Sequence, residues 1–211
     1  MSPASLAFDA RRAVRYLKRA DPRLASLMSQ VGPLRLSVRP VGSPFEALLR
    51  AITYQQLSGK AAATIHSRLL DLFPGGLTPE RLLDTPEAAL RGAGLSRNKM
   101  LSVRDLAAKV LDATVPDFVA LGAMSDEEII ERLTAVRGVG RWTVEMLLIF
   151  TLGRPDVLPL DDLGIRKGFQ LAYRMQRLPA AVTMQRAGRA WTPFRSVASW
   201  YLWRAADAFI V

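Results

Sequence analysis

The sequence LTAVRGVGRWT, residues 133–143, connects two helical patterns and is the most informative segment for the fold. An apolar helix ends at a Gly-Val-Gly turn, and a second apolar helix follows over residues 144–152. Glycine permits positive φ and has no Cβ, so backbone N–H groups at the start of the second helix can approach a phosphate oxygen. We therefore predict a hairpin of two helices over residues 133–152. The alternative is an ordinary turn between helices with a glycine at the C-cap.

Helical periodicity extends over almost the whole chain. Apolar residues recur at spacings of three and four, as in Phe45, Leu48, Leu49 and Ile52. Breaks that contain glycine and proline separate about ten helical segments of ordinary length. Residues 34–41 alternate weakly, but a single extended stretch makes no sheet, so they are expected to be a connection. The predicted fold class is all-α.

The last helix has the clearest predicted start. Thr192 is expected to be its N-cap, with Pro193 at the first helical position. Six apolar residues at helical spacing are expected to form its buried stripe, namely Phe194, Val197, Ala198, Tyr201, Leu202 and Ala205.

Composition limits the classes of function. The 211 residues suffice for one or two domains. The absence of cysteine and the single histidine, His66, exclude disulfides, thiolate metal sites and multi-histidine metal sites. A net charge of +10 is typical of a protein that binds nucleic acid, although 24 Arg against 5 Lys can also reflect the nucleotide composition of a genome. With no membrane span or signal peptide in the pattern, a cytoplasmic, nucleoid-associated location is expected.

A second motif, LPLDDLGIRK at residues 158–167, delivers two carboxylates to the start of another helix. The hairpin followed by this loop resembles the helix-hairpin-helix DNA glycosylase superfamily, and most closely the 3-methyladenine DNA glycosylase II, or alkylbase glycosylase, family. The similarity covers the chain from about residue 44 onward and includes residues 52–58, 94–99 and 191–203.

This resemblance implies two helical subdomains with a DNA-binding cleft between them. Residues 1–211 are then one glycosylase domain, with a central subdomain at approximately residues 44–155 that contains the hairpin. Because the chain starts with a helical pattern, it is expected to be the short form of the family, without the N-terminal β domain.

Asp162 is the candidate catalytic residue. Cleavage of an N-glycosidic bond develops positive charge on the sugar, which a fixed anion stabilises, and a helix N-terminus favours a charged carboxylate. The resemblance aligns the catalytic aspartate with Asp162, which leaves Asp161 as an N-cap or a hydrogen-bonding support. The alternative is that both aspartates only cap the helix. Trp142 stands where bifunctional relatives carry the lysine that forms a Schiff base, so hydrolysis by water is expected.

The resemblance also implies a base pocket and DNA contacts. It places Trp142, Trp203 and Met146 around a flipped base, where aromatic faces would stack on a cationic ring, although each tryptophan taken alone fits a core position better. Glutamine capping and solvated helix starts are the alternatives for several of the DNA contacts. The residues expected to contact DNA are Gly138, Val139, Gly140, Arg141 and Thr143 in the hairpin, Gln55, Gln56 and Ser58 in a wedge loop, and Arg97 and Lys99.

The expected function is that of a monofunctional DNA glycosylase in base excision repair. It would flip alkylated bases such as 3-methyladenine out of double-stranded DNA and hydrolyse their glycosidic bonds as a monomer. No cofactor is required and no side chains offer a metal site, but the hairpin carbonyls near Gly138 can hold a monovalent or divalent cation in this family. The alternatives are a glycosylase for oxidised or mismatched bases and a non-catalytic DNA-binding module.

Overall fold

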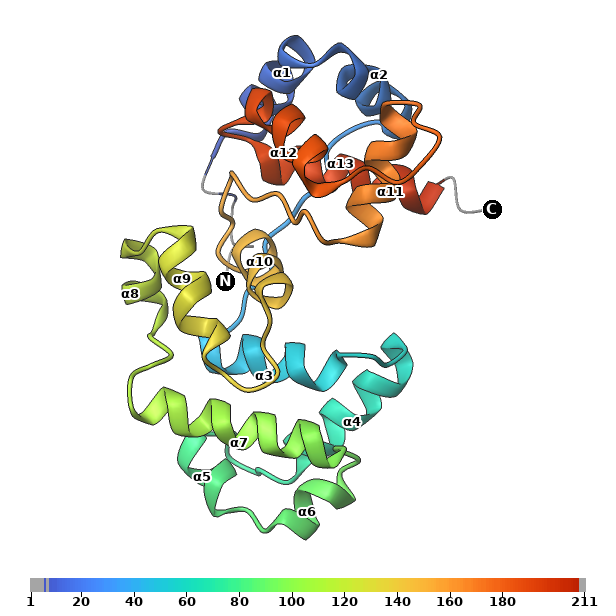
Figure 1. Cartoon of the computed structure of the whole chain (residues 1–211). Coiled ribbons are helices and arrows are strands. Elements are labelled where there is room, and N and C mark those ends of the chain that lie inside the picture. The colour runs from blue at the N-terminus through green and yellow to red at the C-terminus, as the bar shows by residue number, and fades with distance from the viewer. Residues whose placement is uncertain (1–5, 7, 209–211) are drawn as a thin grey trace. The chain divides into compact units, whose positions relative to one another are not determined.

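The computed structural model describes residues 6 and 8–208, and in these residues every regular element is a helix (Figure 1). The all-α prediction is confirmed. The helices are α1 (Ala10–Ala20), α2 (Pro22–Val31), α3 (Pro44–Tyr54), α4 (Gly59–Asp71), α5 (Pro79–Asp84), α6 (Glu87–Gly92), α7 (Arg97–Leu111), α8 (Phe118–Ala123), α9 (Asp126–Thr134), α10 (Arg141–Phe150), α11 (Leu163–Ala172), α12 (Ala181–Gly188), the 3-10 helix η1 (Arg189–Trp191) and α13 (Arg195–Ala208).

The expectation of about ten helices was too low. Three of the thirteen α-helices in the described residues, α5, α6 and α8, have six residues each. Six residues make fewer than two helical turns, so they carry too little periodicity to be recognised in the sequence.

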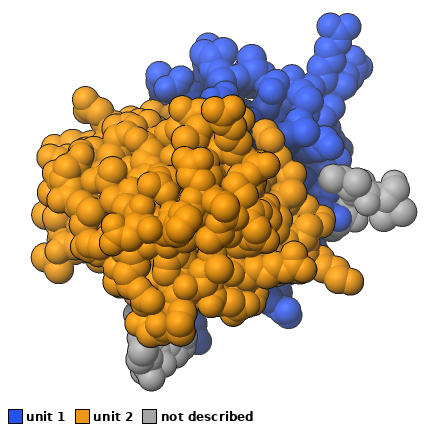
Figure 2. All heavy atoms as spheres, turned by 90° about the horizontal axis from the view of Figure 1, so that it is seen from below, with its two compact units in different colours: residues 1–40, 148–211 blue, residues 41–147 orange. Residues whose placement is uncertain are grey.

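The chain forms two compact units (Figure 2). Unit 2 contains residues 41–147, and unit 1 contains residues 1–40 and 148–211. In unit 2, the long helix α7 packs against α3 and α5 and buries Met100, Val103 and Leu106. In unit 1, α11 and α13 form the most extensive helix pair. Residues 34–41 contain no helix or strand, as expected for a connection, and Arg39 N–H donates to the Phe150 carbonyl at 2.8 Å.

Unit 1 contains a buried polar network around Asp21. The Asp21 carboxylate caps α2, and it also accepts hydrogen bonds from the Tyr173 hydroxyl and from Trp191 Nε1. Burial alone would raise the pKa of Asp21, but the hydrogen bonds from Tyr173, Trp191 and the backbone outweigh it and lower that pKa. The network ties α2 to the end of α11 and to η1.

The predicted start of the last helix is wrong. Its first residue is Arg195, and Thr192 lies before a cis peptide bond to Pro193. The Arg195 N–H donates to Asp156 Oδ1 at 3.1 Å, so a side chain 39 positions away satisfies a donor at the helix start. The predicted buried stripe is confirmed, because all six of its residues are at most 8% exposed.

Candidate functional site

The turn of the hairpin between α9 and α10 has an exposed backbone and a buried central side chain. Gly138 has φ of +76°, and a Cβ there would lie 2.7 Å from Ser102 Oγ of α7. Val139 is only 4% exposed, so its side chain lies in the core of unit 2. Asp105 Oδ2, also on α7, accepts the Arg137 N–H at 2.7 Å. The turn is thereby fixed on α7 with Gly138 and Gly140 exposed, as a backbone contact to phosphate requires.

Arg141, a predicted DNA contact, forms hydrogen bonds with carboxylates of the protein itself. Its guanidinium donates to both carboxylate oxygens of Glu127 at 2.6 and 3.0 Å and to Glu145 Oε1 at 3.1 Å. The hydrogen bond to Glu127 is the largest cause of a raised Arg141 pKa. Glu145 is 6% exposed, so this pairing also compensates a buried carboxylate. Arg141 therefore joins α9 to α10 on either side of the turn, and the neighbouring Thr143 is buried.

The loop after α3, residues 55–58, is the predicted wedge loop, and it is bonded to the hairpin. Gln55 Nε2 donates to the Gly138 carbonyl at 2.9 Å across 83 positions of sequence. Gln56 is exposed and has φ of 56°, an uncommon conformation for a residue other than glycine. Leu57, which was not among the predicted residues, is 39% exposed beside it. Ser58 accepts the Ala61 N–H and is the N-cap of α4.

Lys99 is bonded to the end of α3 that precedes this loop. Its ammonium group donates to the Thr53 carbonyl in the last turn of α3 at 2.7 Å, and burial lowers its pKa. Lys99 is therefore not simply a solvated residue at a helix start. Arg97, in contrast, is exposed at the start of α7. The end of α3 that leads into the wedge loop and the hairpin are thus both bonded to α7.

We expect Gln55→Leu to slow base release from damaged duplex DNA about fivefold, because one hydrogen bond is worth about 1 kcal/mol. Leucine approximates the size of glutamine but cannot donate to the Gly138 carbonyl, so the wedge loop would no longer be held against the hairpin. The measurement is the single-turnover rate of base release, with Gln185→Leu, at an exposed position of α12, as the matched control. Equal rates for the two variants would contradict a role for this bond.

Asp162 lies at the N-terminus of α11 and is its N-cap residue. Its Oδ1 atom accepts the Ile165 N–H at 2.8 Å and Trp203 Nε1–H at 2.8 Å. Asp161 is exposed and does not cap the helix, because α11 begins one residue later, so of its two predicted roles the N-cap is wrong and the hydrogen-bonding support stays a prediction. The carboxylate of Asp162 is held in one orientation by a backbone donor and a side-chain donor.

Gly164 leaves the space that this arrangement needs. A Cβ at Gly164 would lie 2.9 Å from Trp203 Cδ1 and 3.1 Å from Asp162 Oδ1. Trp203 is packed on its other side against Phe150, with ring centroids 5.6 Å apart. The indole of Trp203, predicted as a pocket wall, therefore also orients the Asp162 carboxylate.

The loop that leads to Asp162 is anchored by residues that were not predicted. Asp156 pairs with Arg195 through bonds of 2.8 and 2.9 Å. Ser196 Oγ accepts the Val157 N–H and donates to the Arg154 carbonyl, and Ser199 Oγ donates to the Val157 carbonyl. Ser196 and Ser199 are fully buried beside the apolar stripe of α13. A serine that adjoins such a stripe in the sequence is the one feature that could have predicted an internal hydrogen bond here.

Trp142 and Met146 lie one turn apart on α10 in unit 2. Trp142 is 47% exposed, which rules out the alternative of a core tryptophan at this position, and Met146 is partly exposed. The indole of Trp142 therefore lies partly at the surface of unit 2.

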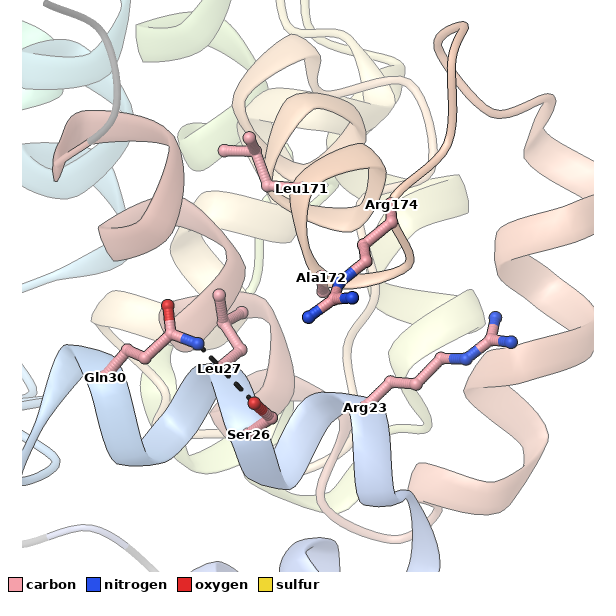
Figure 3. Close-up of a pocket in the computed structure, with 7 residues that line it drawn as sticks. All are labelled: Arg23, Ser26, Leu27, Gln30, Leu171, Ala172 and Arg174. Atoms are coloured by element: carbon pink, nitrogen blue, oxygen red, sulfur yellow. Dashed lines mark hydrogen bonds between the residues drawn. The ribbon is translucent and has the colours of Figure 1, made fainter.

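One well-defined cavity contains none of the predicted site residues. It has a volume of about 260 Å³ and lies between α2 and the end of α11, where Arg23, Gln30 and Arg174 contribute polar groups (Figure 3). The guanidinium groups of Arg23 and Arg174 point away from each other, so the cavity does not converge on an anion.

No group of three or more His, Cys, Asp or Glu side chains in the described residues is placed to hold a metal ion. None of the helices in that part of the chain is both long and apolar enough to cross a membrane. The Gly138 carbonyl, near the expected cation position, accepts the Gln55 amide, so a cation at this oxygen would share it with Gln55.

Known proteins resemble this chain in both sequence and fold. DNA-3-methyladenine glycosylase 1 of Schizosaccharomyces pombe is 38% identical over 186 residues, which cover 87% of this chain and 81% of that protein. A solved structure of a Schizosaccharomyces pombe 3-methyladenine DNA glycosylase in complex with abasic DNA superposes with a TM-score of 0.77 at 37% identity, covering 91% of this chain and 95% of that one. A Bacillus halodurans DNA-3-methyladenine glycosidase gives 0.85 at 35% identity, covering 99% and 94%.

The family model described as HhH-GPD superfamily base excision DNA repair protein matches residues 49–193. This match includes the wedge loop, the hairpin and Asp162. The chain belongs to the HhH-GPD superfamily of base excision DNA repair proteins.

Proposed function

We propose that the protein is a monofunctional DNA glycosylase that hydrolyses alkylated bases such as 3-methyladenine from duplex DNA. The observation that carries the proposal is the Asp162 carboxylate, fixed at the N-terminus of α11 by Ile165 N–H and Trp203 Nε1. Its support is the family membership together with relatives at 35–38% identity that are named for 3-methyladenine.

Asp162 is the group that acts on the sugar. As the bond between C1′ and the base nitrogen breaks, electrons leave with the base and positive charge develops on the sugar ring. The negative charge of Asp162 stabilises this charge, and a carboxylate oxygen orients the water that attacks C1′. The products are the free base and an abasic site. Trp142 offers no amine, so no Schiff base forms and the strand is not cut.

The leaving base explains the preference for alkylated substrates. Alkylation at a purine ring nitrogen gives the base a positive charge, which makes it a good leaving group. The half-exposed indole of Trp142 attracts a cationic ring by about 0.5–2 kcal/mol, whereas a neutral base gains less. A glycosylase for neutral oxidised bases would need further polar recognition groups.

Unit 2 provides contacts to DNA. The backbone of Gly138 and Gly140 contacts a phosphate without reading sequence, and Gln56 or Leu57 fills the gap that the flipped nucleotide leaves. Arg97 adds a phosphate contact at the start of α7. The protein acts as a monomer, because one lesion requires one site.

The test is incubation of the protein with methylated duplex DNA, followed by chromatography of released bases and by gel analysis of strand cuts before and after alkali. We expect release of methylated purines, with cuts that appear only after alkali. Cuts before alkali would indicate a lyase, release from oxidised duplexes alone would indicate the other glycosylase class, and no release from either substrate would leave a DNA-binding module.

A further inference from the structure

A groove on unit 1 combines an apolar floor with a positively charged rim. It lies between α1, α2 and the connection that follows α2, has a volume of about 690 Å³, and contains no predicted site residue. Residues of α1, α2 and α13 line it, and these three helices pack against one another (Figure 1). Its size falls within the range of about 300–1,000 Å³ that is usual for binding sites.

The floor of the groove is formed by apolar side chains from four segments. Val14 of α1 and Leu34 of the connection are partly exposed, whereas Met28 of α2 and Tyr201 of α13 are 1% exposed each. Tyr201 donates its hydroxyl to the Gly32 carbonyl at 3.2 Å and, like Met28, supports the floor from beneath, so the accessible apolar surface comes from Val14, Pro33 and Leu34. The apolar surface is recessed, so it suits side chains that insert into it.

The rim is a row of cations on one face of α1. Arg11, Arg15 and Lys18 follow the helical spacing of four and three, and all three are exposed. In the described part of the chain, none of them forms an ion pair. One carboxylate, Asp9, caps the start of α1 and lies near Arg11 and Arg15. The rim therefore carries more positive charge than its surroundings neutralise.

We propose that this groove binds an acidic peptide segment of a partner protein, with apolar side chains on the floor and carboxylates on the rim. Charge complementarity selects the carboxylates and the recessed floor selects the apolar anchors. Arg11 and Lys18 are separated by about 10 Å along the helix axis, which about three residues of extended peptide span. A segment in which acidic and apolar residues alternate presents the two kinds of side chain to the two parts of the groove.

Other polyanions fit this groove less well. Single-stranded nucleic acid stacks its bases on exposed aromatic faces, whereas Tyr201, the aromatic residue of the floor, is 1% exposed. An anionic membrane takes up apolar side chains that protrude from a protein, but the floor is recessed. Duplex DNA offers phosphates to the rim and no apolar groups for the floor. The peptide uses both features, and its binding is independent of the proposed glycosylase activity.

The test is fluorescence anisotropy with a labelled peptide of about eight residues in which Asp and Glu alternate with Leu and Phe. Two control peptides replace either the apolar residues by Ser or the acidic residues by Lys. Arg15→Glu and Lys18→Glu alter the rim, and Arg12→Glu makes the same charge change at an exposed position of α1 that does not line the groove. Circular dichroism checks that each variant is folded.

We expect Arg15→Glu and Lys18→Glu each to weaken peptide binding at least about tenfold, whereas Arg12→Glu changes it less than about twofold. Both control peptides should bind at least about tenfold more weakly than the probe, and the rim variants should keep their activity on methylated DNA. Equal losses for Arg12→Glu and Arg15→Glu, or full binding of the Ser peptide, would show non-specific charge attraction and overturn the proposal. A loss of duplex binding specific to the rim variants would assign the groove to DNA instead.

Discussion

Asp162→Asn is expected to reduce the release of methylated purines on the order of 10²- to 10³-fold, because it removes the negative charge that stabilises the developing charge on the sugar. Asparagine is as good an N-cap as aspartate, and its carbonyl oxygen can still accept the Ile165 N–H, so α11 should be retained. The measurement is the single-turnover rate on methylated duplex DNA, together with the affinity for a duplex that contains an abasic site.

The neighbouring aspartate provides the matched control. Asp161 is exposed and does not cap α11, so Asp161→Asn should keep the rate within about twofold of the original. Loss of activity in Asp161→Asn with activity retained in Asp162→Asn would reverse the assignment. Loss in both variants together with loss of abasic duplex binding would indicate that the loop serves only to bind DNA.

Local sequence rules identified the elements that carry the site. The Gly-Val-Gly turn, the position of α10 after it, and a carboxylate at the N-terminus of α11 all follow from glycine conformation, helical periodicity and capping preferences. These rules act over a few neighbouring residues, so they can be applied to a single sequence. They place Asp162 at a helix start but give no information on what holds its carboxylate.

The contacts that orient the site join residues far apart in the sequence. Gln55 reaches Gly138 across 83 positions, and Trp203 reaches Asp162 across 41. No periodicity or capping rule links such residues, because their proximity depends on how whole helices pack. The start of α13 shows the same limit: the Asp156 carboxylate accepts the Arg195 N–H, and the locally favoured cap at Thr192 is not used.

Gly164→Ala is expected to slow base release about tenfold to a hundredfold, since an added Cβ would lie 2.9 Å from Trp203 Cδ1 and 3.1 Å from Asp162 Oδ1. Trp203 is also packed against Phe150, so the indole can yield only by moving its N–H away from the carboxylate. Trp203→Phe removes the same donor while it keeps an aromatic ring, and a hydrogen bond to a charged group is worth about 1.5–3 kcal/mol. Both variants therefore disrupt the hydrogen bond between Trp203 Nε1 and Asp162 Oδ1: Gly164→Ala displaces the indole, and Trp203→Phe removes the donor.

A double-mutant cycle tests this coupling. If both substitutions act through the Trp203–Asp162 bond, the double variant Gly164→Ala with Trp203→Phe should be little slower than the slower single variant, because the second change has nothing further to remove. Additive losses would mean that Gly164 and Trp203 contribute independently, for example through packing and base stacking. Thermal unfolding of all three variants shows whether a lower rate only reflects a less stable protein. A rate that falls because the Asp162 carboxylate is misoriented does not require a lower melting temperature. A non-additive cycle in proteins of unchanged stability would identify Trp203 as the residue that sets the orientation of Asp162.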